Sequence, residues 1–140
     1  MINCYFTSPA ELTRKTTMIH KEGRFKGARN KEIAYQVWQP DGPIKAGFLL
    51  VHGLGEHCGR YTNLVNHLLS MNYSVYALDH IGHGKSDGTR KFVSTFADFT
   101  DTLDLYLDYV KEWHAQKPLF LLGHSMGGLI ATDYLLTKQQ

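Results

Sequence analysis

The chain has 140 residues, of which 43% are hydrophobic, and this length suits one domain or part of one rather than two. Its 15 lysine and arginine residues and 13 acidic residues give a net charge of +2, which offers no electrostatic basis for binding nucleic acid or an anionic membrane. The two cysteines, Cys4 and Cys58, form no CxxC pair, so the sequence indicates neither a disulfide framework nor a zinc site.

The amino-terminal stretch, residues 1–15, is polar and indicates no particular element. It lacks the basic and apolar regions of a secretory signal, and no apolar run in the chain approaches the roughly 18 residues needed to span a bilayer. We therefore expect a soluble, cytoplasmic protein.

Two strands are predicted next, over residues 16–22 and 32–40, joined as an antiparallel hairpin by the polar, glycine-containing residues 23–31. A turn follows at residues 40–43. Three apolar runs then predict strands, and none alternates with polar residues, which is typical of strands buried on both faces of a parallel sheet. They span residues 46–51, 74–78 and 119–122.

Helical patterns separate these three strands. The first pattern ends near Asn72 and places apolar residues on one face: Tyr61, Leu64, Val65, Leu68 and Leu69. The second has an apolar, largely aromatic face made of Phe96, Phe99, Leu103, Tyr106, Val110 and Trp113. Four aspartates avoid this face and predict a solvated one: Asp98, Asp101, Asp104 and Asp108. A third helix is predicted from about Met126 almost to the carboxyl terminus.

This order of elements predicts an α/β fold, in which an antiparallel hairpin precedes parallel strands with right-handed crossover helices. An active site in such a fold belongs at the carboxyl ends of the parallel strands. Each of these ends is followed by a glycine-rich loop. The three loops read HGLGEHCGRY from His52, DHIGHGKSDG from Asp79, and GHSMGG from Gly123.

Ser125 is the candidate nucleophile. A sharp turn from strand to helix would expose its hydroxyl, and Gly123 and Gly127 would let strand and helix approach without side-chain collision. The amide of Met126, at the positive end of the following helix, would form half of an oxyanion hole. A glycine-rich helix start with an idle serine is the alternative interpretation.

The loop after the first parallel strand supplies the other half of the predicted oxyanion hole. Gly53 and Gly55 would leave the backbone amide of Leu54 free to face the same point, and His52 helps to shape the site. Two such donors stabilise the charge on a carbonyl oxygen under attack, which predicts acyl-transfer chemistry.

Together, these three motifs resemble the monoacylglycerol lipase and lysophospholipase branch of the α/β-hydrolase family, from about Ile33 onward. The resemblance implies a serine esterase that acts on a lipid monoester, without a metal or organic cofactor. It also implies that Ser125 is the nucleophile and that Leu54 and Met126 form the oxyanion hole. Cys58 stands where the family commonly has serine, a change that we expect to tune reactivity toward thiol reagents.

The base and the acid of a catalytic triad are not apparent. In this fold they follow the serine in the order acid, then histidine, whereas Asp133 is the one acid after Ser125 and no histidine follows it. The resemblance therefore implies that residues 1–140 are the amino-terminal part of a single hydrolase domain. The later strands, the triad aspartate and histidine, and a lid that could contact a membrane surface would lie in a missing segment or a second chain.

Several alternatives stay open at this stage. One of His52, His80, His83 and His124 could replace the missing base, and His80 and His83 are weak candidates for metal ligands. Asp79 is more simply explained as a residue that holds its loop, and Glu56 and His57 as residues that order the oxyanion loop. Without later strands, residues 119–122 would form an apolar sheet edge, which predicts poor solubility or pairing with another chain. A non-catalytic module that binds a partner through this edge is the alternative function.

Overall fold

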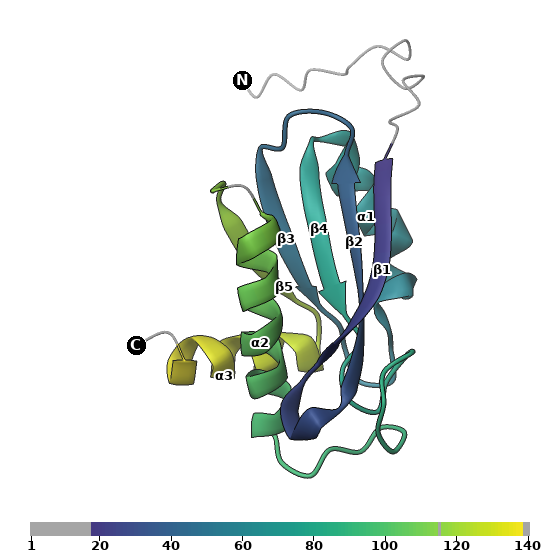
Figure 1. Cartoon of the computed structure of the whole chain (residues 1–140), viewed down its shortest axis with the longest axis vertical. Helices are drawn as coiled ribbons and strands as arrows, with labels where there is room; N and C mark the ends of the chain where they lie inside the picture. The colour runs from purple at the N-terminus through teal and green to yellow at the C-terminus, as the bar shows by residue number, and fades with distance from the viewer. Residues whose placement is uncertain (1–17, 115, 139–140) are drawn as a thin grey trace, which may run out of the picture.

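The computed structural model describes residues 18–114 and 116–138, and it contains one five-stranded sheet (Figure 1). The strands are β1 (Met18–Lys26), β2 (Glu32–Pro40), β3 (Ala46–Val51), β4 (Tyr73–Leu78) and β5 (Leu119–Gly123). They lie in the order β1-β2-β4-β3-β5. β1 and β4 each pair with β2 antiparallel, whereas β4 and β5 each pair with β3 parallel. The predicted α/β class is therefore confirmed.

The hairpin is longer than the sequence pattern predicted. β1 continues four residues beyond Glu22, because residues assigned to the connection pair with β2, as Arg24 does with Ala34. The chain reverses at the short 3-10 helix η2 (Ala28–Asn30), where Arg29 and Asn30 have φ angles of 52° and 57°. The extension places Phe25 in the core, with 6% of its surface exposed. Residues 16 and 17 of the predicted strand lie outside the described residues.

Helices cover both faces of the sheet (Figure 1). The 3-10 helix η3 (Cys58–Tyr61) leads into α1 (Thr62–Ser70) on one face, and α2 (Ala97–Trp113) and α3 (Met126–Lys138) lie on the other. The chain leaves α1 through Asn72, whose φ angle of 64° ends the helix where the sequence predicted. None of the described helices combines the length and the apolar character needed to cross a bilayer.

Two apolar cores follow from this arrangement. The apolar face of α1 packs on one side of the sheet, where its buried residues are Val65, Leu68 and Leu69. The larger core lies under α2 and α3, and its helical residues are Phe99, Leu103, Tyr106, Leu107, Val110, Ile130 and Tyr134. β3 and β4 have helices on both sides, which explains why their sequences do not alternate between apolar and polar residues.

The aspartates of α2 do not all face solvent. Asp98 is 5% exposed and accepts hydrogen bonds from Arg29 Nε at 2.9 and 2.8 Å, and Asp104 accepts one from the Tyr134 hydroxyl at 3.1 Å. The prediction of a fully solvated face is therefore wrong for Asp98. The reason is the η2 turn, which brings Arg29 against the first turn of α2.

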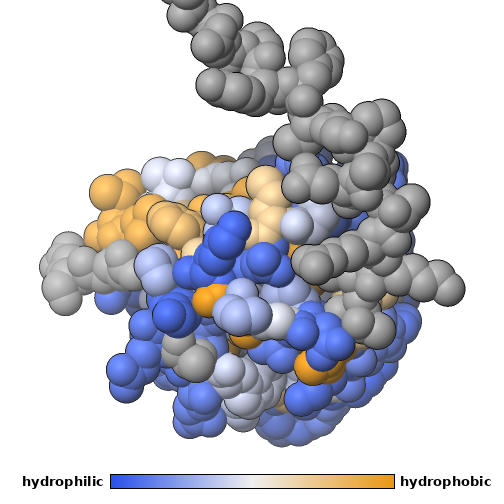
Figure 2. Space-filling model, turned by 90° about the horizontal axis from the view of Figure 1, so that it is seen from above, coloured by the Kyte–Doolittle hydropathy of each residue, from blue (hydrophilic) through white to orange (hydrophobic). Residues whose placement is uncertain are grey.

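β5 forms one edge of the sheet, and none of the described strands pairs with its outer side. Phe120 on this strand is 51% exposed, and its ring lies 5.4 Å from that of Phe48 on β3. Figure 2 shows the end of the molecule where the parallel strands begin, with apolar residues gathered at one side of a largely hydrophilic surface. The apolar edge predicted from the sequence is therefore present in the structure.

Candidate active site

Ser125 occupies a strained turn between β5 and α3. Its φ angle is 54°, in the left-handed region that residues with a side chain rarely adopt. The backbone amide of His124 donates a hydrogen bond to the Val51 carbonyl at 3.0 Å, and the amide of Gly128 donates to the Ser125 carbonyl at 2.9 Å. These bonds tie the turn to β3 and to α3, and they leave the Ser125 side chain exposed.

Strand and helix can approach this closely at the turn only because Gly123 has no side chain. A Cβ atom added at Gly123 would lie 2.4 Å from the carbonyl oxygen of Gly127, which is far inside van der Waals contact. The geometry is that of a nucleophile elbow, in which small residues flank an exposed serine at the carboxyl end of a strand.

The loop that follows β3 lies against this elbow, because β3 and β5 are neighbours in the sheet. A Cβ atom added at Gly53 would lie 3.3 Å from Ser125 Cβ, and Gly55 turns the chain with a φ angle of 72°. The backbone amides of Leu54 and Met126 donate no hydrogen bond to any described residue. Both predicted oxyanion donors are thus free to bind a ligand oxygen.

His52 holds the base of this loop and is fully buried. Its Nδ1 donates to the Gly53 carbonyl at 2.8 Å, and its Nε2 accepts the backbone N–H of His80 at 3.0 Å. Burial lowers the pKa of His52 to about 4, so the ring is neutral near pH 7. Since both ring nitrogens already have partners, His52 shapes the loop and has no nitrogen left for Ser125.

No base is in place beside Ser125. All eight histidines lie within the described residues, and none of them hydrogen-bonds the serine hydroxyl. His80 and His83 are buried, and each directs one ring nitrogen to a backbone carbonyl. Asp133 lies within α3, and across the described residues no group of three or more His, Cys, Asp or Glu side chains could hold a metal ion. The structure therefore gives no support to a base recruited from upstream.

Asp79 holds two of the glycine-rich loops together, as the sequence indicated. Its Oδ1 accepts the backbone N–H of Cys58 at 2.8 Å, and its Oδ2 accepts that of Lys85 at the same distance. Its carbonyl accepts the Ser86 hydroxyl at 2.6 Å. Asp79 is 2% exposed and each of its carboxylate oxygens accepts a backbone N–H, so its role is structural.

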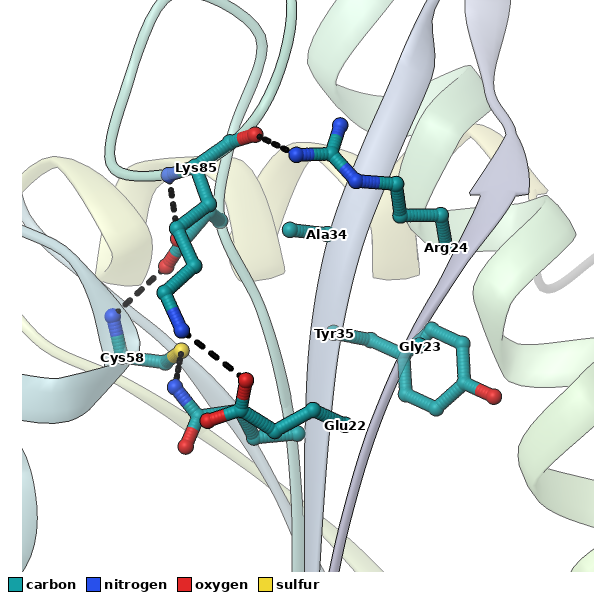
Figure 3. A pocket seen from close by; sticks show the side chains of 9 residues that line it. Glu22, Gly23, Arg24, Ala34, Tyr35, Cys58 and Lys85 are labelled. Carbon is teal, nitrogen blue, oxygen red and sulfur yellow. Dashed lines mark hydrogen bonds and ion pairs between the residues drawn. The ribbon is translucent and has the colours of Figure 1, made fainter.

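Cys58 borders a polar cavity between the hairpin and these loops (Figure 3). An ion pair of 2.9 Å between Lys85 and Glu22 crosses it, and Gln36 Nε2 donates to Cys58 Sγ at 3.1 Å. Burial raises the pKa of the thiol, and Ser125 does not line the cavity. Position 58 therefore holds a buried, protonated thiol of low reactivity, and this thiol is not part of the serine site.

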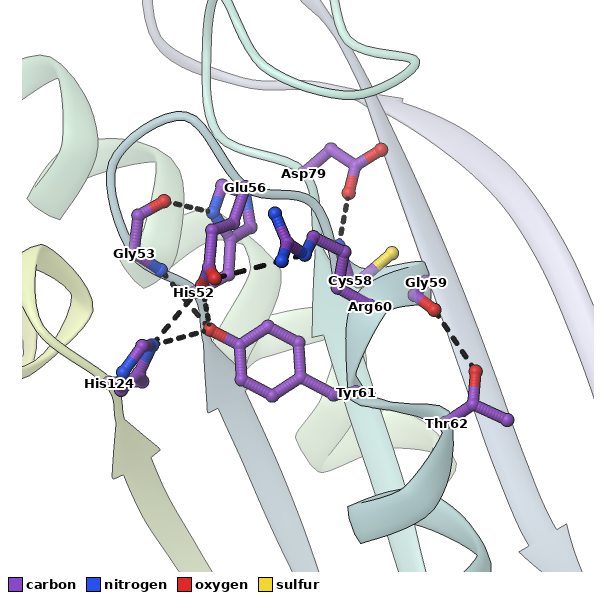
Figure 4. A network of polar contacts seen from close by, with 10 residues as sticks. All are labelled: His52, Gly53, Glu56, Cys58, Gly59, Arg60, Tyr61, Thr62, Asp79 and His124. Atoms are coloured by element: carbon purple, nitrogen blue, oxygen red, sulfur yellow. Dashed lines mark hydrogen bonds and ion pairs between the residues drawn. The ribbon is translucent and has the colours of Figure 1, made fainter.

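A polar network joins the loop after β3 to the elbow (Figure 4), and it includes Glu56, which the sequence indicated as a residue that orders this loop. The Tyr61 hydroxyl donates to Glu56 Oε2, lies 2.9 Å from His124 Nδ1 and accepts the Gly53 amide at 3.4 Å. Glu56 Oε2 also lies 3.2 Å from His124 Nδ1. The sequence pattern placed Tyr61 on the apolar face of a helix, and it indicated neither Tyr61 nor His124 as a partner of Glu56.

Comparison with known proteins agrees with this geometry. Residues 42–140 match the pattern of the hydrolase family described as serine aminopeptidase, S33. The chain belongs to this family. It is 45% identical over 94 residues to the monoglyceride lipase of Mus musculus, and 36% identical over 103 residues to phospholipase YtpA of Bacillus subtilis. These alignments cover 67% and 74% of the chain.

The fold is also that of solved esterases. A thermostable carboxyl esterase from Bacillus coagulans superposes on 88% of the chain with a TM-score of 0.79 and 26% identity. The match covers 42% of the esterase, and the chain spans only 31% and 38% of the mouse lipase and the Bacillus phospholipase. This S33 chain therefore corresponds to less than half of each relative.

Proposed function

We propose that this chain supplies the nucleophile and the oxyanion hole of a serine hydrolase that cleaves a lipid monoester. The observation that carries the proposal is the position of Ser125, which is exposed at a left-handed turn with Gly53 packed against its Cβ atom. Ser125 would attack the ester carbonyl, and the amides of Leu54 and Met126 would stabilise the oxyanion. An acyl-serine intermediate would then be hydrolysed by water.

The substrate class is proposed from the relatives. The most similar ones named above are a monoglyceride lipase and a phospholipase, which favours an ester with one acyl chain, such as a monoacylglycerol or a lysophospholipid. The exposed side chain of Leu54, beside the proposed oxyanion hole, offers apolar surface for such a chain.

The catalytic acid and base are proposed to come from polypeptide outside these 140 residues. None of the eight histidines reaches Ser125, and the outer edge of β5 is unpaired within the described part of the chain. A segment that adds strands to β5 would bring its own loops to the same end of the sheet as Ser125, because the carboxyl ends of parallel strands share one edge.

Labelling with a fluorophosphonate probe tests this function. The protein would be purified from its source, exposed to the probe and analysed by intact mass spectrometry, while hydrolysis of a short-chain ester is followed in parallel. The Ser125→Ala variant is the control. Loss of a triad base costs on the order of 10⁶ in turnover, so active and inactive samples are well separated.

The expected result is one probe adduct on Ser125, in a sample that contains the completing segment in the same or a second polypeptide. If that segment is present and Ser125 stays unlabelled, the hydrolase function is wrong.

The unpaired edge of β5 favours one alternative, a non-catalytic module that binds an extended peptide strand. In that case Ser125 would stay unlabelled in every preparation, and the partner would protect the amides of β5 from hydrogen exchange.

A further inference from the structure

The hydroxyl of Tyr61 uses its whole hydrogen-bonding capacity at one point between two loops. A phenol has one proton to donate and two lone pairs to accept with. The proton goes to Glu56 Oε2, and the lone pairs face the backbone N–H of Gly53 and Nδ1 of His124. Because the only phenol proton is already given to the carboxylate, His124 must carry its own proton on Nδ1.

These partners lie next to the two reacting parts of the proposed site. Gly53 directly precedes Leu54, whose amide is one proposed oxyanion donor, and His124 directly precedes Ser125. A movement of either loop relative to the other would break a bond to Tyr61. The network therefore links the loop that carries the Leu54 amide to the turn that carries Ser125, and the oxyanion hole depends on the distance between these two segments (Figure 4).

We propose that Tyr61 is a positioning residue of the oxyanion hole, which holds the loop of residues 52–55 in register with the Ser125 elbow through its hydroxyl group. This inference rests on the proposed hydrolase function. The hydroxyl of Tyr61 bonds to Gly53, Glu56 and His124 and not to Ser125, so it acts through the residues on either side of the site.

The surroundings keep the network intact near neutral pH. Burial, together with the bond to Glu56, raises the pKa of Tyr61 to about 12, so the phenol retains its proton. The hydrogen bond from Tyr61 lowers the pKa of Glu56, which stays a carboxylate. Arg60 Nε lies 3.9 Å from the other oxygen of Glu56, at the solvent side.

The Tyr61→Phe variant removes only the hydroxyl group. Tyr73→Phe is the matched control, because the Tyr73 ring packs against Phe48 at the opposite end of β4 and its hydroxyl forms no hydrogen bond with a described residue. Both variants would be made in the complete hydrolase, meaning this chain with the segment that supplies the acid and the histidine. The rate constant of fluorophosphonate labelling per reactive Ser125 would be measured, with kcat and KM for a short-chain ester.

For Tyr61→Phe we expect labelling and kcat to fall about 10- to 100-fold with KM nearly unchanged, because a displaced oxyanion donor weakens binding of the transition state but not of the substrate. The fraction of Ser125 that is finally labelled should match that of the wild type. A rate within about twofold of the wild type would overturn the proposal. A lower labelled fraction of Ser125 with an unchanged labelling rate per reactive site would also overturn the proposal, because that is the result expected if the variant only destabilises the fold.

Hydrogen exchange of the Gly53 amide gives a second measurement, on the 140-residue chain without any catalysis. We expect this amide to exchange at least about tenfold faster in Tyr61→Phe than in Tyr73→Phe, because its acceptor is gone. Equal exchange would overturn the proposed tether. If wild-type Ser125 is never labelled while Gly53 responds as expected, the hydrolase function fails and the tether stands.

Discussion

Gly127 lies so close to Val51 that a Cβ atom added to it would be 1.9 Å from the Val51 carbonyl oxygen. Both groups are backbone, one in the first turn of α3 and the other at the end of β3, so neither can rotate away. This contact fixes how closely the helix after Ser125 packs on the sheet.

Gly127→Ala should therefore destabilise the fold by about 1 to 3 kcal/mol, the usual cost of forcing an extra methyl group into a packed site. Gly128→Ala is the matched control, because its added Cβ would lie 3.6 Å from the nearest atom, and alanine is favoured over glycine in a helix. Urea denaturation would measure both variants. If the two variants are equally stable, the prediction is wrong, and the backbone around Gly127 can shift to accommodate the added methyl group.

The elbow and the two loops could be predicted from the sequence because their signals are local. Gly123, Ser125 and Gly127 lie within five residues, directly after an apolar run. The parallel strand order then brings the loops of β3 and β5 together by topology alone.

Contacts between distant residues could not be predicted in this way. Tyr61 and His124 are 63 residues apart, and Arg29 and Asp98 are 69 apart. In the sequence, Tyr61 fits an apolar helix face and Asp98 fits a solvated one. Only the packed sheet shows that Tyr61 reaches across the site and that Asp98 is buried.

The Arg29–Asp98 pair should stabilise the connection between the hairpin and α2. Burial alone would raise the pKa of Asp98. The hydrogen bonds from Arg29 outweigh this effect and lower the pKa below 3.8. The contribution of this pair is therefore present above pH 3.8 and is lost as the pH falls through the lower pKa of the folded state. We expect Asp98→Asn to cost about 1 to 2 kcal/mol at pH 7, a modest value because the guanidinium of Arg29 is half exposed.

The control for this prediction is Asp108→Asn, which removes an exposed aspartate of the same helix. Urea denaturation of both variants and the wild type at pH 7 and pH 3 would test it. A cost for Asp98→Asn that is the same at both pH values would contradict the role of the charge.

Cys58 should be unreactive in the folded protein. It is 1% exposed, and burial raises the pKa of its thiol, so almost no thiolate is present to react. In a Cys4→Ser variant, a thiol reagent should label Cys58 only as urea unfolds the chain, with the same midpoint as the loss of helical circular dichroism. Rapid labelling without urea would show that the cavity beside Cys58 opens in the native state.

The buried histidines should make the protein sensitive to mild acid. Burial lowers the pKa of His52 from 6.5 to about 4, and burial also lowers that of His80 well below 6.5. The unfolded chain therefore binds more protons than the folded one between pH 6.5 and pH 4, and stability must fall as the pH drops through this window. The shift of His52 alone corresponds to about 3 kcal/mol, an upper limit for its contribution.

Nuclear magnetic resonance can follow each ring directly. We expect the Cε1 proton signals of His52 and His80 to stay constant from pH 8 to about pH 5 in the folded protein, and to shift near pH 6.5 when the same sample is unfolded in urea. Urea denaturation at pH 7 and pH 5 would show whether stability falls in parallel. If either ring titrates near pH 6.5 in the folded state, the loop after β3 is more open to water than the structure indicates, and the fixed geometry of the proposed oxyanion hole would be lost with it.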